Sequence, residues 1–206
     1  MEVLKKSRFY GPDVILIFRQ GQYLVEKTYR NKALPIRALG RVLVQWERFI
    51  YSRLAKVQGI PRVYPSGEAF TLITRYMGGE NLRETSKTPD RVYFERLDAL
   101  IDAMHKAGII HLDLRNRRNY GIDPQDRPYL IDFASSIYLV RPRWLRDLFQ
   151  KIDTMGFIKV KAKLNPSLLT DQEKRLLERG NILSRMWLPG LTSRVIRLFG
   201  QKGKKP

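Results

Sequence analysis

The stretch from Ile109 to Phe133, which reads IIHLDLRNRRNYGIDPQDRPYLIDF, restricts the possible folds more than any other part of this chain. Two short apolar runs, 120–122 and 129–131, flank an Asp-Pro-Gln-Asp turn, and this pattern predicts a small β-hairpin. Asn119 and Asp132 then stand at the two ends of the hairpin, close in space. The stretch therefore predicts a cluster of oxygen-bearing side chains in a chain that has only 20 acidic residues.

The composition indicates a globular protein with an anionic partner. Of its 206 residues, 43% are hydrophobic and 11% aromatic, which is enough to bury a core. The absence of cysteine excludes a disulfide framework, thiolate catalysis and a Cys-ligated metal, and only two histidines argue against a His-rich metal site. A net charge of +19 attracts nucleic acids, anionic lipids or phosphorylated substrates. Residues 141–206 hold 16 Lys/Arg against 5 Asp/Glu, so we expect the basic surface to be C-terminal.

The chain carries no sign of export or membrane insertion. Its start, MEVLKKSRFYGPD, lacks the apolar core of a signal peptide. No run of about 18 apolar residues occurs that could span a bilayer. We therefore expect a cytoplasmic protein.

Local patterns predict strands first and helices later. Residues 14–18 and 23–29 read as a hairpin, and apolar residues at helical spacing predict a helix over 36–56. The segment EAFTLITRYMGGENL reads as a strand that ends at a Gly-Gly turn. Thr88, Pro89 and Asp90 supply a cap, a first-turn proline and an acid for a helix up to Gly108. The remainder is basic and helical, with breaks at Pro142, Asn165-Pro166 and Pro189-Gly190, and it ends in the polar tail QKGKKP.

The segment HLDLRNRRN followed by LIDF resembles the catalytic loop and the metal-binding Asp of protein-kinase-like enzymes. The resemblance covers roughly residues 14–136. It implies an α+β fold of minimal bilobal type, with an antiparallel N-lobe sheet plus one helix and a reduced helical C-lobe. We expect one kinase-like domain over 1–206, with the N-lobe at 1–77 and the C-lobe at 78–206. A basic helical extension is expected from about residue 141.

The same resemblance implies ATP and Mg²⁺ as cofactors. Asp113 would orient the acceptor hydroxyl and accept its proton. Asn119 and Asp132 would hold Mg²⁺ against the ATP phosphates, because Mg²⁺ prefers carboxylate, amide and phosphate oxygens. His111 would support the loop around the metal-binding segment.

Upstream residues occur in the order that the family requires. Lys27, in YLVEKTY, stands where the family keeps its phosphate-contacting lysine. Its expected ion-pair partner is Glu47, which is the only acidic residue between Lys27 and Gly67. The segment TLITRYM resembles the adenine-binding hinge, with Thr74 at the gatekeeper place and Arg75 to Met77 offering backbone hydrogen bonds.

Several features depart from the family pattern. Asn119 follows Asp113 by six residues where the pattern has five, so the loop holds one extra residue or Asn116 takes its place. The segment FRQGQ offers one glycine in place of a glycine-rich loop, Ala134 replaces the glycine of D-F-G, and no A-P-E element follows. Asp153 is a candidate anchor for the catalytic loop.

This reduced pattern is similar to small bacterial atypical kinases, namely the RIO-like group and the lipopolysaccharide kinases, including 3-deoxy-D-manno-octulosonic acid kinases. The first hypothesis is phosphorylation of a sugar hydroxyl of a lipopolysaccharide-type glycolipid. The alternatives are a RIO-like serine/threonine protein kinase and a pseudokinase binding module. Apolar and arginine residues alternate over 187–199, which suggests peripheral contact with an anionic surface at the inner membrane face. Nucleic acid is a less favoured partner, because the basic region shows no stacking pattern of aromatic residues.

Overall fold

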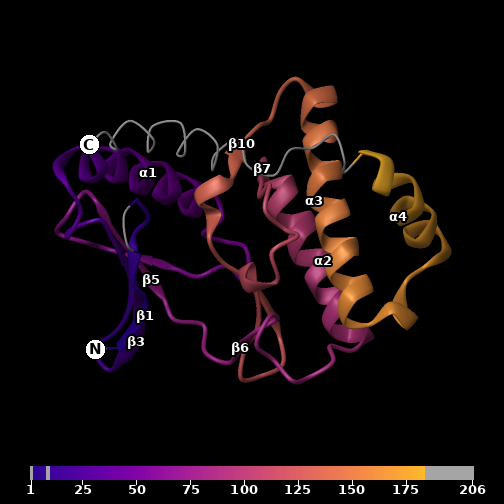
Figure 1. Ribbon diagram of the computed structural model, residues 1–206, viewed down its shortest axis with the longest axis horizontal. Coiled ribbons are helices and arrows are strands. Elements are labelled where there is room, and N and C mark those ends of the chain that lie inside the picture. Colours follow the sequence, from indigo (N-terminus) through magenta and orange to yellow (C-terminus); the bar gives the residue numbers. More distant parts are fainter. Residues whose placement is uncertain (1, 8–9, 184–206) are drawn as a thin grey trace, which may run out of the picture. The chain divides into compact units, whose positions relative to one another are not determined.

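The computed structural model describes residues 2–7 and 10–183, so the features expected at 187–199, at Pro189-Gly190 and in the tail QKGKKP lie outside it. Contacts divide the chain into two compact units, residues 1–168 and 169–206. The first unit holds a sheet-rich N-lobe, indigo to magenta in Figure 1, and a mainly helical C-lobe, magenta to orange. In the second unit, the described helix is α4 (Asp171–Leu183). That the whole chain forms one domain stays a prediction.

The N-lobe is built on a five-stranded antiparallel sheet in the order β1-β2-β3-β5-β4. The expected hairpin is present, because β2 and β3 pair along seven residues each. The strand at the N-terminus was not expected from the sequence, since its four residues are all exposed and carry no buried pattern. The strands are β1 (Glu2–Lys5), β2 (Asp13–Arg19), β3 (Gln22–Thr28), β4 (Val63–Tyr64) and β5 (Thr71–Arg75).

Helix α1 (Leu34–Arg53) follows the hairpin and contacts β5. It begins two residues before the expected 36–56 and ends three residues earlier, where the Leu54 N–H closes the last turn. Gly40 allows the close approach of the preceding segment, because a Cβ there would lie 2.3 Å from the ring of Tyr29. The buried face of α1 repeats at helical spacing and consists of Gly40, Val44, Glu47, Ile50 and Tyr51.

Gly78 and Gly79 connect the two lobes. Their φ angles of +72° and +63° lie in the left-handed region that glycine adopts without steric cost. A Cβ on Gly79 would lie 1.8 Å from the carbonyl oxygen of Ile122, so no other residue fits there. The Gly-Gly turn is thus required both by backbone conformation and by packing.

The C-lobe combines two long helices with short strands. Strands β6, β8 and β9 form one antiparallel sheet, and β7 pairs with β10. The expected small hairpin is therefore present as β8 and β9. The elements are β6 (Glu80–Asn81), α2 (Arg91–Lys106), β7 (Ile109–Ile110), η1 (Arg117–Asn119), β8 (Tyr120–Ile122), β9 (Pro128–Leu130), η2 (Phe133–Ser135), β10 (Ile137–Tyr138), α3 (Arg143–Leu164) and η3 (Pro166–Leu168).

The start of α2 differs in one detail from expectation. Asp90 is the N-cap, and its Oδ1 accepts a hydrogen bond of 2.8 Å from the Tyr93 N–H. Pro89 therefore lies before the helix and is not its first-turn proline, because the Asp side chain competes better for the free backbone donors. The expected apolar face is confirmed, with Phe94, Leu97, Leu100, Ile101 and Met104 buried.

Helix α3 follows Pro142 and ends before Asn165-Pro166, at the breaks expected from the sequence. It buries Asp153, Gly156, Phe157, Ile158 and Val160. Among the residues that the structure describes, no helix is long and apolar enough to cross a bilayer.

Candidate active site

Residues 111–119, which we call the HLD loop, lead from β7 into β8. His111 at its start is fully buried, and its Nε2 lies 3.2 Å from the carbonyl oxygen of Ile131. The imidazole ring packs at 4.9 Å against the ring of Phe133, and the His111 carbonyl accepts a hydrogen bond from Ser135 Oγ. His111 thus joins the HLD loop to the segment that carries Asp132, which is a supporting position, away from solvent.

Asp153 on α3 holds the start of the HLD loop in place. Its carboxylate has no exposed surface and accepts 2.7 Å hydrogen bonds from the backbone N–H groups of His111 and Leu112. His105 Nε2 lies 3.0 Å from the same carboxylate. Leu112 has φ +64°, a left-handed conformation that costs a non-glycine residue about 1–3 kcal/mol. The two hydrogen bonds offset that cost, so Asp153 takes the anchoring position that the sequence only suggested.

The side chains of Asp113 and Asn119 lie in direct contact. Asn119 Nδ2 donates to the Asp113 backbone carbonyl at 3.1 Å and to Asp113 Oδ2 at 3.0 Å. Asn116 Nδ2 also reaches Asp113 Oδ2, at 3.3 Å, but the Asn116 Oδ1 caps the 3₁₀ turn through the Arg118 N–H. The extra residue of the loop therefore lies in this turn, and Asn119 makes the shorter of the two contacts with the Asp113 carboxylate.

Three charged side chains from distant parts of the chain meet near the open end of the β8–β9 hairpin, where Asp132 follows β9. Lys27 Nζ donates to Glu47 Oε2 at 2.8 Å and to Asp132 Oδ1 at 2.9 Å. The Glu47 carboxylate also accepts a hydrogen bond from the backbone N–H of Phe133. Asp132 has φ +64°, which turns its side chain toward Lys27 while Phe133 packs in the interior against Tyr51. Lys27 therefore links the N-lobe sheet, α1 and the LIDF segment.

The electrostatics of this triad follow from burial and pairing. Burial alone would lower the pKa of Lys27, but Glu47 and Asp132 outweigh it and raise that pKa above its usual value. Burial raises the pKa of Glu47, although Lys27 stabilises its charged form. Desolvation acts against the Asp132 carboxylate too, yet the charge and hydrogen bond of Lys27 lower the Asp132 pKa below its usual value. The triad thus presents an ammonium group and a half-exposed carboxylate side by side.

The hinge segment is only partly as expected. Thr74 is buried in β5, where it pairs with Val25 of β3. The backbone N–H of Arg75 donates to the carbonyl of Arg62, and that of Tyr76 donates to the carbonyl of Tyr23. These two N–H groups are used within the N-lobe, so of the N–H donors expected to face adenine only that of Met77 keeps its role as a candidate.

The FRQGQ segment is not a phosphate loop. Its Gly21 lies in the β2–β3 turn, at the end of the hairpin where Arg19 pairs with Gln22. Lys27 lies at the opposite end, where it pairs with Val14. The connection between β1 and β2 reaches that end of the sheet, because Lys5 also pairs with Val14.

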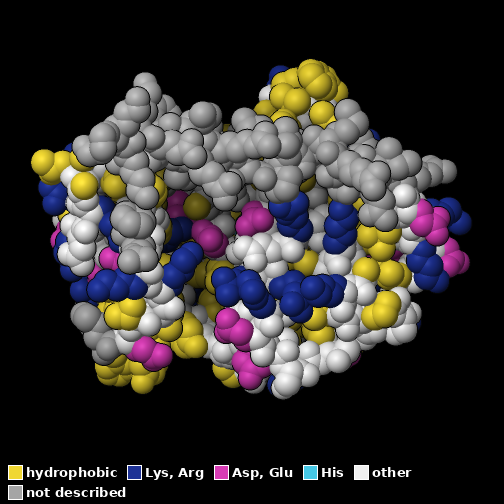
Figure 2. Space-filling view, viewed as in Figure 1, with side chains coloured by type: hydrophobic (Ala, Val, Ile, Leu, Met, Phe, Trp, Pro, Cys, Tyr) yellow, Lys and Arg dark blue, Asp and Glu magenta, His cyan; other side chains and the backbone are white. Residues whose placement is uncertain are grey.

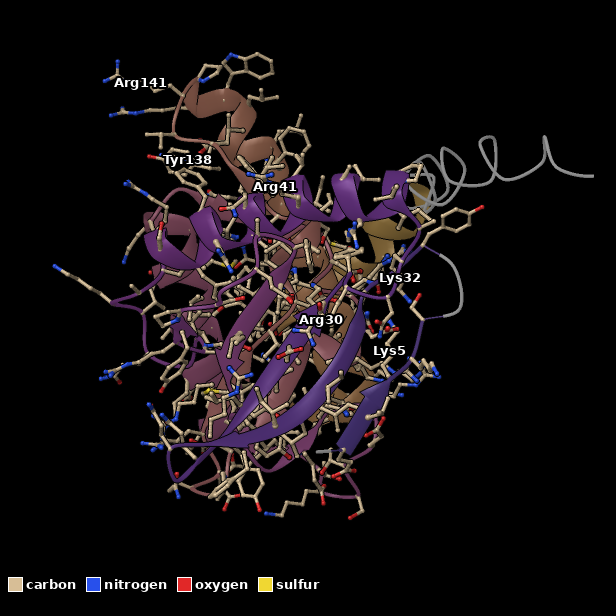
Figure 3. All side chains as sticks on the ribbon, turned by 90° about the vertical axis from the view of Figure 1, so that its left-hand side faces the viewer. Lys5, Arg30, Lys32, Arg41, Tyr138 and Arg141 are labelled. Carbon is tan, nitrogen blue, oxygen red and sulfur yellow. The ribbon has the colours of Figure 1, made fainter. Side chains whose placement is uncertain are left out.

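Lys5 is a charged residue that sequence analysis missed. It lies in the same row of paired residues as Lys27, two strands away, because Lys5 and Lys27 each pair with Val14 of β2. Its positive charge contributes to the lowered pKa of Asp132. Figure 3 shows Lys5 on the same side of the N-lobe as Lys32, which bonds Asp13 and the Ser7 carbonyl at the β1–β2 connection. Only the pairing of β1 reveals this position, since EVLK carries no motif.

A pocket of about 620 Å³ opens beside Asp113. On the face shown in Figure 2, Lys and Arg side chains gather in the region where Figure 1 places α3 and the small three-stranded sheet. The pocket is lined by Arg83, Asp113, Arg115, Asn116, Arg117, Lys159, Val160 and Lys163. Arg83 and the two α3 lysines carry no sequence motif, because their side chains converge with the loop arginines only in the folded chain.

Comparison with solved structures identifies the fold. The Rio2 kinase of Chaetomium thermophilum in a complex described as ADP/Mg²⁺-phosphoaspartate matches with a TM-score of 0.64 and 18% identity, over 83% of this chain and 58% of that chain. A second structure of the Rio2 kinase from the same organism matches with a TM-score of 0.59 and 17% identity, over 91% of this chain and 74% of that one. This chain has a protein-kinase-like fold. The kinase-like α+β architecture expected from the sequence is thereby confirmed.

The kinase-like chain spans 58% of the first of these neighbours. No protein-family model matches it, and no curated protein does. Membership of the bacterial lipopolysaccharide-kinase group therefore remains a hypothesis.

The residues present fit a magnesium ion completed by phosphate oxygens. Among the described residues there is no group of three or more acidic, His or Cys side chains that could hold a metal ion alone. Asn119 uses its amide nitrogen toward Asp113, so its amide oxygen is the atom available to a cation. The half-exposed carboxylate of Asp132 would be the second oxygen ligand. Two protein oxygens suit Mg²⁺, which is usually held by one or two carboxylates plus substrate phosphates.

Proposed function

We propose that the kinase-like chain is a Mg²⁺- and ATP-dependent phosphotransferase that moves the γ-phosphoryl group to a hydroxyl acceptor. One observation carries the proposal: Lys27 contacts the buried carboxylate of Glu47 and the half-exposed carboxylate of Asp132, in the same fold that brings Asp113 and Asn119 together. A chain that kept the fold only as a scaffold would have no need of the buried Lys27–Glu47 ion pair, since buried charges are costly to desolvate. The pseudokinase alternative is correspondingly disfavoured.

In the proposed reaction, the acceptor oxygen forms a bond to the γ-phosphorus while the bond to the β,γ-bridging oxygen breaks, and ADP leaves. The hydroxyl proton passes to the Asp113 carboxylate. The hydrogen bonds from Asn119 to Asp113 Oδ2 and the backbone carbonyl fix the orientation of that carboxylate. Mg²⁺, when bound at Asn119 and Asp132, would neutralise phosphate charge as it develops.

The phosphate side of the site is provided by cations of the N-lobe. Lys27, held by Glu47, would contact the nucleotide phosphates. Lys5 stands in β1, two strands away from Lys27 in the same row of paired residues, and would add a second positive charge where kinases with a glycine-rich loop use backbone N–H groups. Adenine would lie against the hinge near Thr74, Arg75 and Met77, with the Met77 N–H as the backbone donor and Arg75 contributing its carbonyl.

The acceptor class has two candidates. The Rio2 neighbours support the RIO-like serine/threonine protein kinase better than the lipopolysaccharide sugar kinase. The first of them was described with ADP, Mg²⁺ and phosphoaspartate, which supports the use of nucleotide and Mg²⁺ here and adds transfer to a protein carboxylate as an outcome to be tested. The sugar acceptor is favoured by the small basic pocket beside Asp113. Contact with an anionic membrane remains a proposal that rests on net charge.

The test is transfer of label from γ-labelled Mg-ATP by the full chain, with glycolipid acceptors, a protein extract and no acceptor in parallel reactions. Asp113→Asn and Asp132→Asn should each abolish transfer. Asp126→Asn is a matched control, because Asp126 is an exposed carboxylate whose ion-pair partner among the described residues is the exposed Lys87. Transfer that survives Asp113→Asn contradicts the assigned roles.

The position of the label distinguishes the acceptor classes. Label on glycolipid alone supports the sugar kinase, and acid-stable label on serine or threonine supports the RIO-like kinase. Label on the protein itself that hydroxylamine removes indicates an acyl phosphate on an aspartate. Failure of the chain to bind Mg-ATP contradicts the proposed function as a whole.

A further inference from the structure

We propose that the pocket beside Asp113 holds a phosphate group of the acceptor, so that the acceptor is a phosphorylated sugar-type alcohol. The inference rests on the proposed phosphotransferase function and specifies its substrate class. The phosphate can belong to a free sugar phosphate or to the phosphorylated headgroup of a glycolipid, since the two present the same chemistry to the pocket.

The charge of the pocket is the first argument. Its five cationic side chains are not ion-paired within the part of the chain that the structure describes, whereas exposed Arg30 and Arg127 each pair with a carboxylate. Five like charges around about 620 Å³ repel one another, and a bound dianion would remove that repulsion. Arginine binds phosphate through two parallel hydrogen bonds, and lysine acts as a point charge. The five residues are Arg83, Arg115, Arg117, Lys159 and Lys163.

The pocket is assembled from three separate elements, which is the second argument. Arg83 follows β6, Arg115 and Arg117 belong to the HLD loop, and the two lysines lie on α3. Lys159 and Lys163 are four residues apart, so they project from the same face of the helix. A basic face that served only solubility would not need side chains from three elements to converge on one cavity.

The geometry of these elements is held rigidly. Asp153 fastens α3 to the start of the HLD loop. Three residues later, Gly156 brings the helix against the loop, since a Cβ there would lie 2.9 Å from the Arg115 backbone nitrogen. The spacing between the lysines of α3 and the arginines of the loop is thus set by backbone packing, as a specific binding site requires.

The pocket lies on the acceptor side of the site. It includes Asp113, the expected base, but neither Lys27 nor Asp132, which serve the nucleotide in the proposed reaction. A sugar phosphate whose phosphate group is bound in the pocket would therefore have a sugar hydroxyl near Asp113, and it would not displace ATP. The volume suits a sugar phosphate, because pockets for small ligands measure about 300–1,000 Å³, whereas an extended peptide requires a longer groove or a free strand edge.

The experiment is isothermal titration calorimetry of the full chain with saturating Mg-ADP. The probes are glucose 6-phosphate, fructose 1,6-bisphosphate, and glucose as the uncharged control. Lys159→Ala and Lys163→Ala should each weaken binding of the phosphorylated probes about tenfold or more, as expected for loss of one charge-assisted hydrogen bond. Lys151→Ala is the matched control, because Lys151 is exposed on α3 and lies outside the pocket. It removes the same charge and should leave binding unchanged.

Several results would overturn the inference. Equal effects of Lys151→Ala and Lys163→Ala would show unspecific attraction, and displacement of the probe by Mg-ATP would assign the pocket to the nucleotide. A stronger affinity for a phosphopeptide than for either sugar phosphate would exclude a sugar-type acceptor. Binding only to vesicles that contain a phosphorylated glycolipid would support the inference and identify its source.

A further arm separates this inference from the proposed function. The titration is repeated without nucleotide, and binding of Mg-ATP is measured alone. Sugar phosphate binding that depends on Lys159 and Lys163, in a chain that does not bind Mg-ATP, would support the pocket and refute the kinase. Binding of Mg-ATP with no such dependence would refute the pocket and leave the kinase intact.

Discussion

The carboxylate of Asp153 offers the sharpest test of how the site is held together. In Asp153→Ala, the backbone N–H groups of fully buried His111 and partly buried Leu112 lose their acceptor. Each buried group left without a partner costs about 1–3 kcal/mol. Two such groups, with the freed His105 ring beside them, predict a loss of about 3–5 kcal/mol in the free energy of unfolding.

This loss is large for a domain of this size. It corresponds to a fall in melting temperature of about 6–20 °C, at about 2–4 °C for each kcal/mol. Asp153→Asn should cost less, because the amide oxygen still accepts one of the two N–H groups, while its amide nitrogen faces the other donor. The predicted order of stability is therefore wild type, Asp153→Asn, Asp153→Ala.

The assay is urea unfolding followed by circular dichroism, together with hydrogen exchange of the His111 and Leu112 amides. Asp147→Ala is the control. Asp147 lies on the same helix but is exposed, and its ion-pair partner among the described residues is Arg146. It should change stability by no more than about 0.5 kcal/mol. If Asp153→Ala also stays within that limit, or if both amides remain protected in it, the anchoring role of Asp153 is wrong.

Three other predictions follow from buried or closely packed groups. Lys27→Met should destabilise the chain by about 3–5 kcal/mol in urea unfolding, because Glu47 is left buried without its partner. Adding Glu47→Leu should restore most of the lost stability. A double variant that is no more stable than Lys27→Met contradicts the pairing argument. Gly156→Ala should cost about 1–3 kcal/mol, because its Cβ would press on the HLD loop, whereas Gly67→Ala, with open space around it, should be nearly neutral in the same assay. Burial disfavours the charged form of Asp123, but hydrogen bonds from Arg127 and Gln125 outweigh it and lower the Asp123 pKa below its usual value of about 3.9. The contribution of this carboxylate to stability is therefore complete above pH about 3.9 and is lost as the pH falls through the lowered pKa. The stability difference between wild type and Asp123→Asn should shrink from pH 6 to pH 2.5, and a difference independent of pH would refute the assignment.

The local sequence pattern determined most of the helices and strands of this protein. The β2–β3 hairpin, α1, α2 and the β8–β9 hairpin all follow from residue spacing, because each depends on contacts within a few residues. The resemblance to protein-kinase-like enzymes added five candidate site residues in the order that the family requires. They are Lys27, Glu47, Asp113, Asn119 and Asp132. The structure brings Lys27 together with Glu47 and Asp132, and Asp113 together with Asn119.

Only the tertiary structure decided what surrounds those residues. Lys27 and Asp132 are 105 positions apart, and Asp153 reaches His111 across 42. Lys5 lies in one row of paired residues with Lys27 only because β1 pairs with β2. The α3 lysines face the HLD loop only because Gly156 lets the helix approach. Spacing along the chain carries no signal for contacts at such separations. They depend on how whole strands and helices pack, and this packing turned a recognisable motif into a site with an anchored loop and a basic pocket.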